Sequence, residues 1–482
     1  MTLTLVWFRQ DLRLADNPAL VAAARAGTVL PVYVHDPEAA GAWPPGGASR
    51  WWLHHSLASL AAALAERGLA LTIRHGPALA ALRTLARETG ATAVRWNRRY
   101  EPALVEQDRR VKQALADDGL DIHSHKAALL HEPWTLRTGQ GRAYQAFTPF
   151  WRALCRDGEP DRPLPEPAMH APPSAPTGES LASLQLLPRV RWDEGLRAAW
   201  TPGEAGAHER LGAFLRNRLG HYADARDYPA TAGTSALSPH LHFGEVSPRQ
   251  VWHAVRERCA AGTGTEPLAD STGKYLSELG WREFAHHVLF HFPELPDNPL
   301  NRRFSAFPWR EDPDGRLREA WQAGRTGFPL VDAGMRELWA TGWMHNRVRM
   351  VAGSLLVKNL RLPWQLGERW FWDTLVDADL ANNSLGWQWV AGSGADAAPY
   401  FRIFNPVRQG ERFDPAGDYV TRWIPELAGL PARYRHAPWT APADVLAEAG
   451  LTLGRDYPRP IVDLKTSRQQ ALEAFQRVKQ GA

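Results

Sequence analysis

The chain has 482 residues, of which 44% are hydrophobic and 22% are charged, a balance typical of a folded protein with two or three domains. No apolar run approaches the roughly 18 residues of a membrane span, and two cysteines are too few for a disulfide framework. The N-terminus has no secretory signal and the net charge is +4, so we expect a cytoplasmic protein without membrane association and with an anionic partner such as nucleic acid.

Short β-like runs alternate with amphipathic stretches over the first 130 residues. Helical patterns at 51–68 and 77–90 stand between such runs. This alternation predicts an α/β domain with a parallel sheet and crossover helices. No GxGxxG follows the first run, which argues against a standard dinucleotide site there. The predicted strands are 3–8, 29–36, 69–76, 92–99 and 120–126.

A proline-rich stretch separates this region from the second half of the chain. Residues 158–178 contain seven prolines, which regular helix or sheet does not tolerate. We interpret the stretch as an interdomain linker over the surface, a disordered loop being the alternative. The sequence therefore predicts an α/β domain at 1–130, a linker at 131–200 and an all-α domain at 201–482.

Helical patterns dominate after residue 200. On one of these predicted helices Glu278, Trp281 and Arg282 share a face, and a plain surface ion pair of Glu278 with Arg282 is the alternative interpretation. No metal-ligand spacing is present, because adjacent histidines such as His286 and His287 point to different sides of a helix, and we interpret them as core or surface histidines. The predicted helices cover 204–219, 247–262, 274–292, 335–360 and 367–380.

On the predicted helix 335–360, Asn346 falls beside Arg349 and Met350, and Trp343 falls beside Arg347. Two helices that each present an aromatic or thioether beside a charge or amide could line one cavity.

Two further stretches combine polar groups unusually. Residues 222–248 hold Thr234, Ser235 and Ser238 in a glycine-marked turn, which could offer hydroxyls and amides to a phosphate or simply cap a helix. The stretch DADLANNSLGWQW at 377–389 packs carboxylates, amides and tryptophans together. Buried polar groups need partners, so this stretch is either a wet surface or the lining of a pocket for a flat ligand with polar edges.

Together these stretches resemble the photolyase/cryptochrome flavoproteins, most closely class I cyclobutane pyrimidine dimer photolyases. The resemblance runs nearly end to end. It implies a Rossmann-like antenna domain, a large all-α C-terminal domain that binds FAD, and a monomer without an obligate protein partner. The segments that carry it are LVWFRQDLRLADNPAL, FTPFWRAL, RDYPATAGTSALSPHLHFGEVSPRQ, ELGWREF, TGFPLVDAGMRELWATGWMHNRVRM, DADLANNSLGWQW and GADAAPYFRIFNP.

The resemblance also implies a role for each cofactor-side residue. Asn383 should face the redox-active flavin ring nitrogen, Asp377 should pair with Arg349, and Asp379 should contact the flavin or ribityl edge. The residues expected around the diphosphate are Tyr222, Thr234, Ser235, Ala236, Leu237 and Ser238, with Tyr275 and Arg282 nearby.

The implied reaction is blue-light-driven repair of UV-damaged DNA, in which excited reduced FAD gives an electron to a flipped-out pyrimidine dimer. Glu278 and Asn346 should hydrogen-bond that dimer, and Trp281, Trp389 and Met350 should be its apolar walls. The residues expected to contact phosphates are Arg226, Arg347 and Arg402, and the chain expected to carry electrons to the flavin is Trp387, Trp364 and Trp309.

Three alternatives stay open at this point. The (6-4) photolyases carry histidines in the dimer pocket where this chain has Asn346 and Met350. Plant cryptochromes, which are blue-light photoreceptors, typically have Asp in place of Asn383 and Tyr in place of Trp389. A non-catalytic nucleic-acid-binding protein would hold no chromophore. Tyr100-Glu101 is not followed by the Asn-Glu pair usual in folate-binding members, which argues against a folate antenna. The antenna site is therefore open to a deazaflavin, a folate or another chromophore, or to none.

Overall fold

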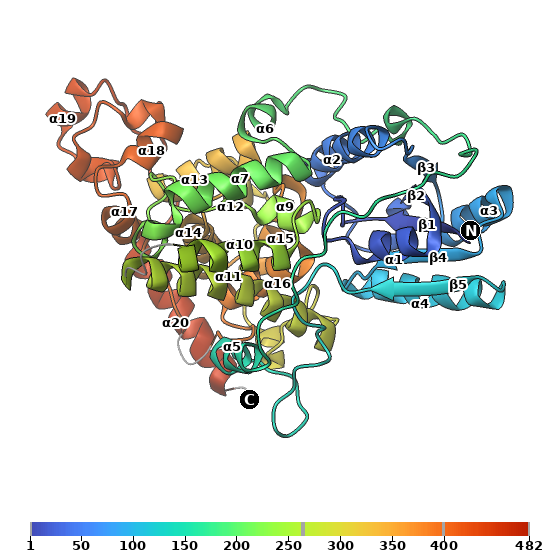
Figure 1. Ribbon diagram of the computed structural model, residues 1–482. Helices are drawn as coiled ribbons and strands as arrows, with labels where there is room; N and C mark the ends of the chain where they lie inside the picture. The colour runs from blue at the N-terminus through green and yellow to red at the C-terminus, as the bar shows by residue number, and fades with distance from the viewer. Residues whose placement is uncertain (1, 262–265, 398–400, 481–482) are drawn as a thin grey trace.

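The computed structural model describes residues 2–261, 266–397 and 401–480 of the chain. A parallel five-stranded sheet occupies the N-terminal part, in the order β3-β2-β1-β4-β5 (Figure 1). All five predicted strands are confirmed, and so is the α/β class of this part. The strands are β1 (Thr2–Phe8), β2 (Gly27–His35), β3 (Thr72–His75), β4 (Ala93–Asn97) and β5 (Asp121–His125).

The central strands β1 and β2 are rich in apolar residues and mostly buried, because helices cover the sheet. Leu5 of β1 pairs with Leu30 on one side and with Val94 on the other, and all three side chains are buried. The helices of this part are α1 (Pro18–Ala26), α2 (Gly47–Ala65), α3 (Ala78–Thr89) and α4 (Pro102–Asp117).

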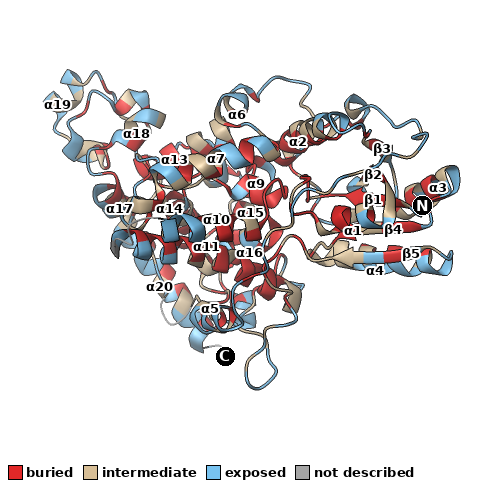
Figure 2. Ribbon diagram, viewed as in Figure 1, coloured by how far each residue is buried: buried red, intermediate tan, exposed pale blue. Residues whose placement is uncertain are grey.

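The C-terminal half is largely helical, as predicted, and its helices surround a buried interior (Figure 2). None of the described helices is long and apolar enough to cross a bilayer. Helices α17 to α19 lie at the end of the molecule far from the sheet (Figure 1). The helices are α7 (Glu204–Asn217), α8 (Tyr222–Ala225), α9 (Ser238–His242), α10 (Pro248–Ala261), α11 (Glu266–His291), α12 (Arg316–Gln322), α13 (Pro329–Thr341), α14 (Asn346–Ser354), α15 (Trp364–Thr374), α16 (Leu380–Ala391), α17 (Pro406–Phe413), α18 (Asp418–Trp423), α19 (Ala443–Glu448) and α20 (Leu464–Gln480).

Two of the predicted helices are wrong as continuous elements. The stretch 335–360 breaks after α13 because Gly342 ends that helix at φ 69°, and His345 then starts α14 by accepting a hydrogen bond from the amide of Arg347. A π-helical turn, η5 (Leu355–Asn359), follows α14. The stretch 367–380 breaks at an extended Leu375, and Asp379 begins α16. Capping by single residues therefore overrides the helical periodicity here.

The predicted linker region contains two helices, α5 (Phe147–Arg156) and α6 (Glu194–Ala199), so it is not irregular throughout. Its proline-rich part, 158–178, has neither helix nor strand, as predicted. This part follows the sheet, because the amide of Val29 in β2 donates to the carbonyl of His170 over 2.9 Å. The domain boundaries at 130 and 200 stay a prediction.

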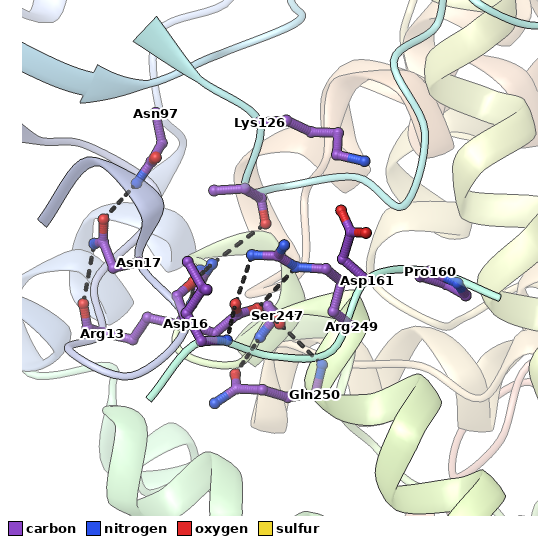
Figure 3. A network of polar contacts seen from close by, with 12 residues as sticks. Arg13, Asp16, Asn17, Asn97, Lys126, Pro160, Asp161, Ser247, Arg249 and Gln250 are labelled. Atoms are coloured by element: carbon purple, nitrogen blue, oxygen red, sulfur yellow. Dashed lines mark hydrogen bonds and ion pairs between the residues drawn. The ribbon is translucent and has the colours of Figure 1, made fainter. Parts of the chain in front are cut away.

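A buried polar network joins the two halves (Figure 3). The carboxylate of Asp16 accepts hydrogen bonds from Arg249 of α10 (2.5 Å), from Ser247 (2.5 Å) and from the amide of Leu164 (2.9 Å). Burying a charge is costly unless it is paired in this way. Gly244 is required nearby, because its φ is +64° and a Cβ there would lie 2.3 Å from the carbonyl oxygen of Gln10. The network thus fixes the sheet against the helical half.

Candidate functional site

The start of helix α16 is built around the buried carboxylate of Asp379. Its Oδ1 accepts from the amide of Asn382 over 2.9 Å, which caps the helix, and its Oδ2 lies 3.4 Å from Nε2 of His286 and 3.7 Å from Nδ1 of His242. Burial alone would raise the pKa of Asp379, but the two imidazoles outweigh it and hold that pKa well below its usual range. Burial would likewise lower the pKa of His286, and Asp379 raises it instead. The arrangement is an ion pair at the end of a helix.

Asn383 lies one turn into α16 and is oriented by helix α15. Its Nδ2 donates to the main-chain oxygen of Glu368 over 3.0 Å, which leaves Oδ1 to accept from a ligand. The next residue, Ser384, donates to Oε1 of Glu368 over 2.5 Å. Glu368 is fully buried, and burial raises its pKa well above the ordinary value, which favours the neutral form of the carboxyl group. The main chain of Glu368 therefore orients Asn383, while its carboxyl group contacts the neighbouring Ser384.

Trp387 is buried where α15 and α16 cross. A Cβ added to Gly367 of α15 would lie 2.1 Å from Cη2 of Trp387, so only glycine allows this packing. Trp387 and Trp364 belong to one buried cluster, and Trp309 packs against it. The ring neighbours of Trp387 are Phe371, at 5.0 Å, and Trp321, at 6.0 Å. The order of an electron chain through these tryptophans stays a prediction.

Arg349 and Asp377 form a half-buried ion pair. The Nη2 of Arg349 lies 2.9 Å and 3.1 Å from the two carboxylate oxygens, and its Nε donates to the carbonyl of Met344 over 2.7 Å. Trp343 and Arg347 do not share a helix as predicted, because Trp343 precedes α14. The ring of Trp343 lies 6.0 Å from the guanidinium of Arg349.

The glycine-marked turn contacts two buried tyrosines. Tyr275 donates to the hydroxyl of Ser235 over 3.0 Å, and the rings of Tyr222 and Tyr275 meet edge-on at 5.1 Å. Ala236 adopts a left-handed φ of 51°, which is uncommon for a residue with a Cβ and marks a constrained turn. Thr234 is half-buried, Leu237 is buried and Ser238 begins α9. The turn can therefore present hydroxyls and amides to a bound anion.

Two of the arginines expected to contact phosphates, Arg226 and Arg347, are paired with carboxylates. Glu278 does not pair with Arg282 as one interpretation expected. It accepts instead from Arg226 over 2.6 Å, and Arg282 donates to the carbonyl of Ala128 over 2.7 Å. The guanidinium of Arg347 pairs with Asp227 over 2.7 Å.

Two further contacts involve residues predicted to bind the dimer or the phosphates. Asn346 and Met350 contact each other with Nδ2 3.9 Å from the sulfur, and the guanidinium of Arg402 lies over the ring of Trp389 at 5.2 Å. Arg402 is exposed to solvent, whereas Trp389 is half-buried.

A separate cavity of about 310 Å³ lies between the sheet and the helical half. It opens at the carboxyl ends of β1, β2 and β4, where strand order reverses and α/β proteins usually bind ligands. Its lining includes Trp7, Tyr33, Trp43, Glu101 and Trp372. His242 also lines it, so one imidazole separates this cavity from Asp379.

Comparison with known proteins decides the family. The DNA photolyase family matches residues 4–168, and the FAD binding domain of DNA photolyase matches residues 275–477. The chain belongs to the photolyase/cryptochrome family. A deoxyribodipyrimidine photo-lyase of Agrobacterium fabrum is 49% identical, over 98% of both chains. Cryptochrome-1 of Arabidopsis thaliana is 42% identical, over 98% of this chain and 70% of its own length.

Among solved structures, a bacterial class III photolyase from Agrobacterium tumefaciens is similar with a TM-score of 0.95 and 48% identity, covering 100% of this chain and 98% of its own. The family expectation is therefore confirmed. The expectation of class I is not, because these similar proteins are a class III photolyase and a plant cryptochrome and not specifically class I members.

The residues of this photolyase-family site fit FAD. Ser235 and its turn suit a diphosphate, the Arg349–Asp377 pair suits a polar ring edge, and Asn383 offers an oriented acceptor. One buried donor, Nε1 of Trp387, has no hydrogen-bond partner within the described part of the chain. Buried polar atoms without a partner are rare and indicate a missing ligand or water.

Sequence reasoning missed His242, His286, Glu368 and Trp321. His286 looked like a core or surface histidine because its partner Asp379 is remote in the sequence. Glu368 gave no local signal either, since only the crossing of α15 and α16 buries it.

Proposed function

We propose that this chain is a photolyase of the class III type, which uses blue light to repair cyclobutane pyrimidine dimers in DNA. The observation that carries the proposal is the setting of Asn383. A neutral amide with its oxygen free stands at the position where plant cryptochromes typically carry an ionisable aspartate. The 49% identity to a deoxyribodipyrimidine photo-lyase supports the same activity.

In this proposal the chain holds and insulates FAD, which when bound would supply the light absorption and the transferable electron. Asn383 would accept a hydrogen bond from the flavin through its free Oδ1, and the raised pKa of Glu368 favours a carboxyl group that adds no competing negative charge. Asp379 and His286 place a compensated ion pair at the same edge. Arg349 and Asp377 would contact a polar edge of the flavin, and the turn at Ser235 would hold the diphosphate.

Glu278 is proposed to bind the flipped dimer through the oxygen that Arg226 does not use. Its Oε1 is occupied by Arg226, so Oε2 can accept from a pyrimidine ring N–H. Asn346 donates to the dimer, while Trp281, Trp389 and Met350 exclude water from it. Arg347 and Arg402 contact phosphates, which position the duplex without reading sequence.

The test is repair of an oligonucleotide that carries one cyclobutane thymine dimer. Blue light should restore intact thymines in the presence of the purified protein, and the dark reaction should restore none. Chromatography of the digested oligonucleotide measures the product. A protein that absorbs blue light through FAD yet restores no thymine under illumination would overturn the proposal.

One observation favours a second candidate function. The 42% identity to Arabidopsis Cryptochrome-1 makes a blue-light photoreceptor the alternative. Such a protein would bind FAD and respond to light without repair, so the same assay separates the two functions.

We also assign the cavity at the strand ends to an antenna chromophore, either a deazaflavin or a folate. Its aromatic lining and its place at the switch point of the sheet support a flat ligand. Ala40 lines the cavity, so Ala40→Trp should fill it. That variant should lose the second chromophore on cofactor extraction and retain FAD. A content of the second chromophore in the variant equal to that of the wild type would contradict the assignment.

A further inference from the structure

Helix α5 begins with the segment FTPFWRAL, which has no role in the site so far. Its first residue, Phe147, lies flat against Trp281, one wall of the proposed lesion pocket. The ring centroids are 3.9 Å apart and the planes differ by 9°. Aromatic pairs in proteins usually lie 4.5–7 Å apart and are often edge-on, so this is an unusually close face-to-face contact.

A third ring supports the stack from behind. Trp151 is one turn further along α5 and stacks on Phe147 at 6.2 Å and 13°. Trp151 fits there only because residue 280 is glycine, since a Cβ on Gly280 would lie 2.3 Å from Cε3 of Trp151. Glycine is unfavourable inside a helix, and this packing explains its presence in α11. Phe284 meets Trp281 edge-on at 5.8 Å.

The backbone of this segment is fixed to the opposite side of the pocket. The amide of Phe147 donates to Oδ1 of Asp396 over 3.1 Å, and the amide of Asp396 donates to the carbonyl of Gln145 over 2.9 Å. Asp396 adopts a left-handed φ of 55°, a strained conformation that the two hydrogen bonds maintain. It lies just after α16, the helix that carries Trp389. One clamp therefore joins both proposed tryptophan walls.

We propose that Phe147 is a positioning residue for lesion recognition, an inference that rests on the proposed function. It covers one face of the Trp281 indole and holds the ring in place, which leaves the opposite face for a flipped pyrimidine dimer. Without Phe147 the indole must be ordered when the dimer binds, and that ordering weakens binding. Undamaged duplex is held by phosphate contacts and does not need the ring. Phe147 therefore contributes to discrimination between damaged and undamaged DNA.

The test compares dark binding of a dimer-containing oligonucleotide and its undamaged counterpart. Phe147→Leu keeps apolar volume and removes the flat face. It should weaken binding of the damaged oligonucleotide about two- to twelvefold, the factor for ordering one side chain, and leave the undamaged one unchanged. Trp281→Ala should weaken it more, about five- to 150-fold, as for loss of one base stack. Phe147→Tyr keeps an aromatic ring and should discriminate between the two oligonucleotides as the wild type does. Phe150→Leu is the matched control, because Phe150 is buried on the same helix and does not stack on Trp281.

A double variant separates positioning from general destabilisation. Phe147→Leu should cost nothing further in the Trp281→Ala background, since it acts only through that ring. If Phe147→Leu weakened both oligonucleotides equally, or did so as strongly in the Trp281→Ala background, the inference would be overturned. If Trp281→Ala reduced discrimination and Phe147→Leu did not, the role of Phe147 would be refuted, whereas the proposed dimer pocket with Trp281 as a wall would be supported. An unchanged Trp281→Ala would contradict the pocket itself, and the inference with it.

Discussion

Replacing Gly367 by alanine tests the packing that holds Trp387 beside Asn383. Alanine is normally better than glycine inside a helix by about 1 kcal/mol. At this position, however, the added Cβ would lie 2.1 Å from Cη2 and 2.5 Å from Cζ2 and Cζ3 of Trp387. Carbon atoms pack at about 3.5–4.0 Å, so the indole or helix α15 has to move by more than about 1 Å. Overpacking of this kind costs about 1–3 kcal/mol.

A second glycine in the same site supplies the matched control. Gly386 lies inside α16 and is exposed, and a Cβ there would meet nothing within 4 Å. Gly386→Ala should therefore stabilise the protein by about 1 kcal/mol. Gly367→Ala gains the same helix propensity but also incurs the cost of overpacking. Its free energy of unfolding should therefore be lower than that of Gly386→Ala by about 1–3 kcal/mol. Urea unfolding of the two variants beside the wild type measures this difference.

The FAD content of the two variants provides a second measurement. Displacing Trp387 also displaces α15, whose Glu368 carbonyl orients Asn383, so Gly367→Ala should retain less FAD after purification. Gly386→Ala should retain the wild-type amount. If Gly367→Ala stabilised the protein as much as Gly386→Ala does, the indole would not be confined between α15 and α16 and the reasoning would be refuted.

Three further predictions concern charge, DNA binding and electron supply. The raised pKa of His286 contributes stability that should be complete below about pH 6.5 and lost as pH rises through the folded pKa. The lowered pKa of Asp379 contributes stability that should be lost as pH falls below about 4. Burial lowers the pKa of His287 to about 4, so the opposite trend is expected there, with stability lost as pH falls from about 6.5 to about 4. Urea unfolding of His286→Gln and His287→Gln at pH 5.5 and 9 compares the two histidines. Arg402→Ala should weaken binding of damaged and undamaged DNA alike and reduce the salt dependence, so an effect on damaged DNA only would contradict a phosphate contact. Trp387→Phe should fold at a cost below about 1.5 kcal/mol and slow the light-driven bleaching of oxidised FAD absorption, and bleaching at the wild-type rate would remove Trp387 from the electron route.

Much of the fold could be predicted because its signals are local. Strands β1 and β2 follow from runs rich in apolar residues, since a parallel sheet is buried on both faces and needs no alternation. The prolines of 158–178 excluded regular structure without any tertiary information. The helix breaks at Gly342 and Leu375 could not be predicted from periodicity, because a cap changes only one or two residues in an otherwise helical pattern.

The sequence by itself determined the chemical groups of the site and their grouping into stretches, through motifs such as DADLANNSLGWQW. Only the tertiary structure decided which group pairs with which. Glu278 pairs with Arg226 and not with Arg282, its neighbour on the same helix, because α8 brings a second guanidinium within 2.6 Å. The pKa of Glu368 is raised because the crossing of two helices buries it, and that of Asp379 is lowered because His242 and His286 converge on it. Desolvation and charge depend on neighbours in space, and these lie far apart along the chain.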